Sequence, residues 1–238
     1  MTNLPTRRDE AWRYADLDAL ARLWPLPAAE QIVVAEGDTL SRVLVQDTGG
    51  VQQINLILER GAQALFYVLN CGGDYGRVDL SVTLKQGAHF SLQAAQIGGD
   101  SQTLEIVTTV THAEPDATSR QTVRSVLAGH ATGTYLGKVA VARDAQHTDS
   151  EQSVKAMLLD RAATANAKPE LEIFADDVKC AHGCAIGELD PVALFYLESR
   201  GLPPADARTL LLQAFVSGVF DGAEDAEALQ ALALAKLY

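Results

Sequence analysis

The chain has 238 residues, of which 47% are hydrophobic, and its 19 Lys and Arg residues against 31 Asp and Glu residues give a net charge of −12. This length can hold one good-sized domain and a smaller appendage, and the hydrophobic fraction is ample for a packed core, which argues against general disorder. The acidic balance argues against binding to a nucleic-acid backbone or to an anionic membrane surface, because both need clustered Lys and Arg.

The three cysteines are too few to form a closed set of disulfides in a chain of this size, and such sparse thiols are typical of a reducing compartment. The first ten residues lack the apolar segment of a signal peptide, and no apolar run in the sequence approaches the roughly 20 residues of a membrane-spanning helix. We therefore expect a cytoplasmic protein.

Residues 1–30 are predicted to form an N-terminal helical segment with one short helix over residues 8–24. Its apolar residues recur near helical spacing until two prolines end the pattern. These residues are Ala11, Trp12, Leu17, Leu20 and Leu23, followed by Pro25 and Pro27. We expect an amphipathic cap here and assign it no chemistry.

Residues 31–187 are predicted to form the core, and their dominant period is two. For example, Val78, Leu80, Val82 and Leu84 alternate with polar residues. Gly, Pro and Asp turn signals follow about every ten residues. Many short strands at even spacing indicate a sandwich, a barrel or a solenoid.

An internal repeat favours the solenoid. The pattern Leu-x-x-Gly-Ala begins at Leu58 and again at Leu84, an offset of 26 residues that suits one coil of a β-helix. The first and last coils of a solenoid expose apolar interior and unpaired backbone groups, so its ends need caps or a partner.

Residues 188–238 are predicted to form a C-terminal helical subdomain. Three helices are expected over residues 190–200, 204–220 and 223–237, and Asp190 is a candidate N-cap for the first. Their apolar faces can pack among themselves and onto the last coil, or can form a docking surface.

Two cysteines and a histidine lie within five residues at the end of the strand region. On an extended segment Cys180, His182 and Cys184 share one face, and thiolate and imidazole ligands spaced in this way can reach one metal ion. Alternatively, the two small thiols simply fill a core, because cysteine is among the most buried residue types.

Several enzyme motifs are absent from the sequence. The nearest approach to a phosphate-binding loop, residues 133–139, is one residue too short and has Val139 where Ser or Thr is needed. Neither G-x-S-x-G nor H-E-x-x-H occurs. If the protein depends on ATP, a partner would therefore bind and hydrolyse it. Among acidic residues, only the pair Asp176 and Asp177 suggests catalysis by carboxylates.

A set of motifs covers about residues 75 to 220. It consists of His112-x-x-Pro115-x-x-x-Ser119, Gly137-Lys138-Val139, residues 145–152, residues 168–173, Ala-Asp-Asp-Val-Lys-Cys-Ala-His-Gly at 175–183, Gly-Glu-Leu-Asp at 187–190 and Leu-Phe-Tyr-Leu-Glu-Ser-Arg-Gly at 194–201. In this order the motifs resemble the SufB/SufD family, the scaffold proteins of SUF iron–sulfur cluster assembly. Cys180-x-His182-Gly183 is similar to the SufD form of the last strand motif. Compared with full-length relatives the chain is N-terminally shortened.

The resemblance implies a right-handed parallel β-helix and a SufD-like, non-catalytic scaffold subunit. Such a subunit pairs with SufB and docks the ABC-type ATPase SufC, here through the helices at 190–200 and 204–220. Cys180 and His182 match the SufD residues placed at the SufB–SufD interface. A transient iron–sulfur cluster or iron is therefore expected in the complex and none on the isolated chain.

The hypothesis for the site is that His182 contributes an iron or cluster ligand and that Cys180 supports it. Cys184 departs from the family pattern and is either incidental or a third ligand. The isolated chain is expected to form a homodimer. Two alternatives stay open: a β-helix enzyme acting on carbohydrate or acyl substrates, and a standalone metal-binding protein that uses all three side chains.

Overall fold

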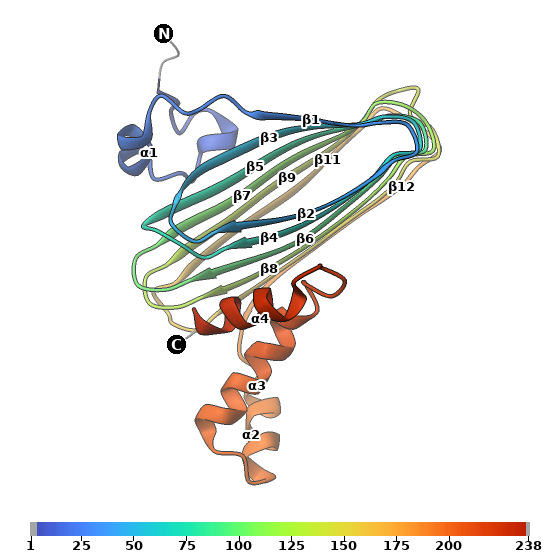
Figure 1. The fold of residues 1–238 in the computed structure, drawn as a ribbon. Coiled ribbons are helices and arrows are strands. Elements are labelled where there is room, and N and C mark those ends of the chain that lie inside the picture. Colours follow the sequence, from blue (N-terminus) through green and yellow to red (C-terminus); the bar gives the residue numbers. More distant parts are fainter. Residues whose placement is uncertain (1–3, 237–238) are drawn as a thin grey trace.

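The computed structural model describes residues 4–236, which wind into a parallel β-solenoid with helices before and after it (Figure 1). Each coil contributes one strand to each of two sheets. The first sheet contains β1 (Glu30–Val34), β3 (Gly50–Leu58), β5 (Tyr75–Leu84), β7 (Thr103–His112), β9 (Thr132–Val141) and β11 (Thr164–Ile173). The second contains β2 (Thr39–Gln46), β4 (Gln63–Asn70), β6 (His89–Gly98), β8 (Thr118–Leu127), β10 (Asp149–Leu158) and β12 (Lys179–Glu188). The predicted solenoid is confirmed.

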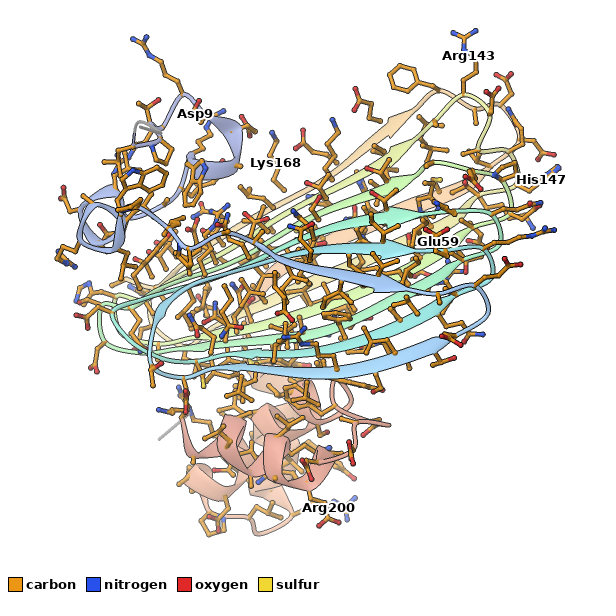
Figure 2. All side chains as sticks on the ribbon, turned by 45° about the horizontal axis from the view of Figure 1, so that its top comes forward. Asp9, Glu59, Arg143, His147, Lys168 and Arg200 are labelled. Atoms are coloured by element: carbon orange, nitrogen blue, oxygen red, sulfur yellow. The ribbon has the colours of Figure 1, made fainter. Side chains whose placement is uncertain are left out.

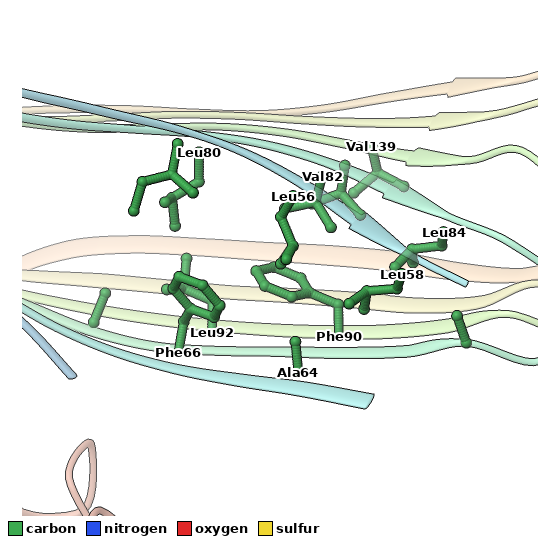
Figure 3. Packing of buried hydrophobic residues seen from close by; sticks show 14 of the residues in the cluster. Leu56, Leu58, Ala64, Phe66, Leu80, Val82, Leu84, Phe90, Leu92 and Val139 are labelled. Carbon is green, nitrogen blue, oxygen red and sulfur yellow. The ribbon is translucent and has the colours of Figure 1, made fainter. Parts of the chain in front are cut away.

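Inward-facing side chains of successive coils stack in lines and fill the space between the sheets. Val82 pairs with Val110, and Val110 pairs with Val139 in the next coil, so one apolar position repeats along the solenoid. The Phe66 and Phe90 rings stand on adjacent strands with their centroids 6.1 Å apart (Figure 3). This interior is the main apolar core of the molecule.

The sequence repeat marks the turn between the two sheets. Leu58 and Leu84 are cross-strand partners, and the glycines that follow them, Gly61 and Gly87, both have φ of 65°. Glycine adopts this left-handed conformation without steric cost, which explains its recurrence at the turn. In the next coil Asp116 takes the equivalent place with φ of 62°.

The N-terminal segment differs from the single helix that was expected. It contains a 3-10 turn, η1 (Glu10–Trp12), and a separate short helix, α1 (Leu17–Leu23). The break is explained by Asp16, whose carboxylate accepts hydrogen bonds from the backbone N–H groups of Asp18 and Ala19 and so starts a new helix.

This segment packs on the outer face of the first sheet, where it covers a buried cation. The guanidinium of Arg77 lies 3.8 Å from the centre of the Trp12 ring and donates a hydrogen bond of 2.8 Å to the carbonyl of Ala11. It also pairs with the fully buried carboxylate of Glu105 at 3.3 Å. An ion pair between Glu10 and Lys168 of β11 joins the segment to the last coil (Figure 2).

The C-terminal region contains α2 (Pro191–Ser199), α3 (Pro204–Ser217) and α4 (Ala226–Ala235). The predicted end of the third helix, at Leu237, lies outside the described residues. As predicted, Asp190 caps α2 by accepting a hydrogen bond from the N–H of Val192 at 2.8 Å. The helices were expected on the last coil, but α3 and α4 pack mainly on the outer face of the second sheet, against apolar residues of β4, β6 and β8. The end of the solenoid is therefore left open.

Candidate functional site

The open end of the solenoid is formed by β11 and β12, which are the outermost strands of the two sheets. Each has ten residues, and within residues 4–236 no strand pairs with the free edge of either one. Almost every residue of β12 is exposed, whereas β10 beneath it alternates between buried and accessible positions. Unpaired edges of this length are templates for pairing with a further chain.

The register of β12 on β10 decides which way the candidate side chains face. Ser150 and Gln152 of β10 are 1% exposed and point into the interior. Their cross-strand partners are Cys180 and His182, and Cys184 follows two residues later opposite the buried Val154. All three candidates therefore lie on the inward face of the last rung, where no further coil covers them.

The three side chains differ in their surroundings. Cys180 is half-buried and packs against the edge of the apolar core, while His182 and Cys184 are exposed. Burial raises the pKa of the Cys180 thiol above its ordinary value, the backbone of Ser150 opposes this by hydrogen bonding, and the charge of Asp149 adds to it. The thiol is thus held in its neutral form at neutral pH.

Two polar lines run through the otherwise apolar interior and end at the candidate residues. In the first, Nε2 of His112 lies 2.9 Å from Oγ of Ser119, which lies 2.9 Å from Oγ of Ser150. Cys180 occupies the next rung of this line.

The second line consists of Gln121, Gln152 and then His182. The hydroxyl of Tyr135 reaches both glutamines, because it donates to Oε1 of Gln121 at 3.1 Å and accepts from Nε2 of Gln152 at 3.1 Å. Sequence reasoning missed these inward polar residues. The one signal that could have found them is the alignment of successive coils, which places polar residues at the same inward position.

The donor set at the open end is incomplete on this chain. Among residues 4–236 no group of three or more His, Cys, Asp and Glu side chains is arranged to hold a metal ion. Cys180 and His182 nevertheless supply the thiol and imidazole donors that suit iron and iron–sulfur clusters. Two donors on an open rung can take part in a site that a facing subunit completes.

Apolar residues flank the candidate site on both sides. Phe174 after β11 is 59% exposed and Ile186 of β12 is 47% exposed. On α2, Phe195 is 70% exposed and Val192 is 73% exposed, and that helix contributes no buried residue.

None of the helices described over residues 4–236 has the length and apolar character to span a membrane.

The fold and the site define a class of protein. It is a parallel β-solenoid with helices packed on its side and with thiol and imidazole donors on its open last rung. Residues 28–215 match the model of the family described as SUF system FeS cluster assembly, SufBD core domain. The match covers most of the chain, so the chain belongs to the SufBD family.

Individual relatives agree with this family. An iron–sulfur cluster assembly SufBD family protein of Synechocystis is 33% identical over 167 residues, which cover 69% of this chain and 37% of the relative. The iron–sulfur cluster assembly protein SufD of Escherichia coli is 28% identical over 184 residues, which cover 77% of this chain and 43% of the relative. A chloroplastic protein of Arabidopsis thaliana is 36% identical over 163 residues, covering 62% of this chain and 34% of the relative. The chain thus spans well under half the length of these relatives.

Proposed function

We propose that the chain is a SufD-like scaffold subunit for iron–sulfur cluster assembly and that it is not itself an enzyme. The observation that supports this most directly is the open last rung, which presents the Cys180 thiol and the His182 imidazole on one face at the edge of the solenoid. A scaffold must hold iron or a cluster and then release it, so an incomplete donor set suits the task better than a closed cage. The cluster is cargo in this proposal.

The partner that completes the site is a SufB-like paralogue. Two ten-residue free edges offer main-chain hydrogen bonds to it, and Phe174 and Ile186 offer apolar contact. In the absence of that partner, a second copy of this chain can take its place on the same edges. The isolated chain is therefore proposed to be a homodimer.

The second partner is a SufC-like ABC ATPase, for which α2 and α3 are the proposed platform. This assignment is supported by the exposed apolar residues Val192, Phe195 and Tyr196 on a helix that buries nothing against the solenoid. Exposed apolar groups gathered on one element are typical of interaction sites. The sequence lacks a phosphate-binding loop, which agrees with ATP binding by a partner.

Within the site, His182 is proposed as the iron or cluster ligand and Cys180 as its support. Cys184 lies on the same face two residues further along, and its exposed position permits either an incidental role or a third donor. The three cysteines are all free thiols, which agrees with the reducing cytoplasm as the proposed location of the protein.

The test is cluster formation on the complex after replacement of His182 by Ala. We expect anaerobic co-expression with SufB-like and SufC-like partners to give at least about tenfold less iron and sulfide per complex, because a ligand is lost. His130, which is also exposed but lies in the turn between β8 and β9, gives the control His130→Ala, which should leave the yield unchanged. An unaltered yield in His182→Ala would disprove the role of His182.

Co-purification separates the proposal from the two alternatives. A scaffold retains an ABC-type ATPase and a larger paralogue, whereas a β-helix enzyme needs neither. A standalone metal-binding protein would hold stoichiometric metal on the isolated chain.

A further inference from the structure

Gln152 is a buried amide directly beneath the candidate ligand His182. Its side chain is 1% exposed, and its Nε2 donates to the Tyr135 hydroxyl at 3.1 Å and to the Gly137 carbonyl at 3.2 Å. A carbonyl oxygen can only accept, so the bond to Gly137 fixes which end of the amide carries the nitrogen. The oxygen Oε1 must then point elsewhere.

Oε1 of Gln152 has no hydrogen-bond partner within the described part of the chain, although it is buried. Leaving a buried acceptor unpaired costs about 1–3 kcal/mol, so an orphaned atom of this kind calls for an explanation. On the deeper side, Nε2 of Gln121 is also unpaired, but it makes no hydrogen bond to Gln152.

On the open side, the next residue in the same line is His182, the cross-strand partner of Gln152. Residues 4–236 give the His182 ring no hydrogen bond or ion pair, and both residues border one depression of about 410 Å³. A neutral imidazole carries one N–H donor and one acceptor nitrogen. A free donor and a free acceptor therefore occupy neighbouring rungs.

We propose that Gln152 is a positioning residue for His182. In the described conformation Oε1 and the His182 ring make no hydrogen bond. In the proposed one, Oε1 accepts from one ring N–H of His182, which fixes the tautomer and leaves the other nitrogen unprotonated toward the open end. This inference rests on the proposed role of His182 as an iron or cluster ligand. Metal-ligating histidines generally have their second nitrogen held in this way, and loss of such a partner costs about 10- to 100-fold in metal affinity.

The amide suits this role because it is itself held from behind. The Tyr135 hydroxyl that binds Nε2 of Gln152 also lies 3.1 Å from Oγ1 of Thr108 and donates to Gln121. The acceptor is thus fixed by a buried network, whereas a surface side chain would have to be ordered anew on each binding event.

The hydrogen bond is tested on the full isolated chain without iron, by 15N NMR of the histidine rings at about pH 8, where an ordinary imidazole is neutral. In the wild-type chain the two ring nitrogens of His182, assigned with His182→Gln, should show the well-separated shifts of a single tautomer. In Gln152→Met they should move toward the averaged values of free histidine. The matched control Gln96→Met removes a buried amide of β6 that bonds to the backbone of Leu104 and Thr134 and to Ser125, outside this network, and should leave the His182 shifts in place.

Two results would overturn the hydrogen bond: averaged ring shifts already in the wild-type chain, or the same His182 shifts in Gln152→Met as in the wild type. If Gln152→Met fails to fold, Gln152→Glu keeps an acceptor at this position and should retain the single tautomer, and averaged shifts in the wild-type chain still overturn the hydrogen bond. Iron retention on the complex is the second readout, with an expected loss of about 10- to 100-fold in Gln152→Met. Altered shifts with unchanged iron overturn the positioning role, and if His182→Ala also retains iron, the failure lies in the proposed function.

Discussion

His112 shows how the solenoid interior constrains a single titratable side chain. The ring is fully buried, and its Nε2 lies 2.9 Å from Oγ of Ser119. Burial lowers the pKa of His112 from 6.5 to about 4, because the charged imidazolium would lose its hydration. His112 is therefore neutral at neutral pH and belongs to the stability of the coil.

A pH dependence of stability follows from this shift. The unfolded chain binds a proton at His112 below pH 6.5, whereas the folded chain does so only below about 4. The stabilisation is thus fully present above the unfolded pKa and is lost as pH falls through this window, by about 3 kcal/mol in total.

The measurement is urea unfolding of the wild-type chain and of His112→Gln, which keeps a group able to hydrogen-bond to Ser119. The stability difference between the two should shrink by about 3 kcal/mol between pH 6.5 and 4, because carboxylate titration is common to both. A difference that stays constant with pH would mean that His112 can take up a proton in the folded coil.

The sequence predicts the shared face of Cys180, His182 and Cys184, because that follows from strand geometry alone. It left open whether the thiols fill a core or meet a partner, and the two cysteines prove different: Cys180 packs on the core edge while Cys184 is exposed. Gln152 was missed because residues 149–153 are all polar, so the sequence pattern does not show which of them face inward. Its inward position becomes evident only when coils are aligned across some 30 residues.

At the scale of elements, strands and helices could be predicted where the local sequence pattern is unambiguous. β5 alternates cleanly and could be predicted, whereas β10 has polar residues on both faces, so periodicity gives no direction there. The capped start of α2 follows from Asp190 and Pro191 in the sequence. Asp16 is an equally good cap. The prediction of one helix over residues 8–24 did not take this cap into account, and the structure has η1 and α1 there instead.

The exposed helix α2 gives a prediction about the ATPase. Phe195→Asp should weaken retention of a SufC-like partner by at least about 2 kcal/mol, or roughly 30-fold, because large apolar side chains dominate docking energies. The fold should be unaffected, since α2 has no buried residue. Co-purification of the ATPase and circular dichroism of the variant provide the two measurements.

Val33 supplies the control for this experiment, because it is also an exposed apolar residue, at 62%, but lies in β1 at the other end of the solenoid. Val33→Asp should keep the ATPase. Equal retention by Phe195→Asp and the wild-type chain would remove α2 from the proposed platform.

For the whole molecule, the solenoid follows from the repeat at Leu58 and Leu84 together with the family motifs. The open end does not follow, because the apolar faces of the C-terminal helices look the same whether they cover the last coil or the side of a sheet. In the structure the C-terminal helices cover the side of the second sheet, where they pack on Tyr67, Ile97 and Val126. That choice exposes the candidate site.

The open end predicts the oligomeric state of the isolated chain. Ile186→Lys should raise the dissociation constant of the homodimer by at least about tenfold, because it places a charge among the apolar residues of the free edge. Val33→Lys at the opposite end is the matched control and should remain dimeric. Sedimentation equilibrium distinguishes the two, and a wild-type chain that sediments as a monomer would contradict the proposal.

The strands at the two ends of the solenoid differ in length. At one end β1 has five residues and β2 has eight, whereas at the other end β11 and β12 have ten residues each. On the shorter side, Arg42 and Glu30 also form an ion pair at 2.7 Å, and charges on an edge disfavour strand addition. Head-to-tail stacking of copies would lead to open-ended filaments, whereas joining like ends stops after one event. In the proposed homodimer, the unequal ends would therefore stop association after one pair of copies.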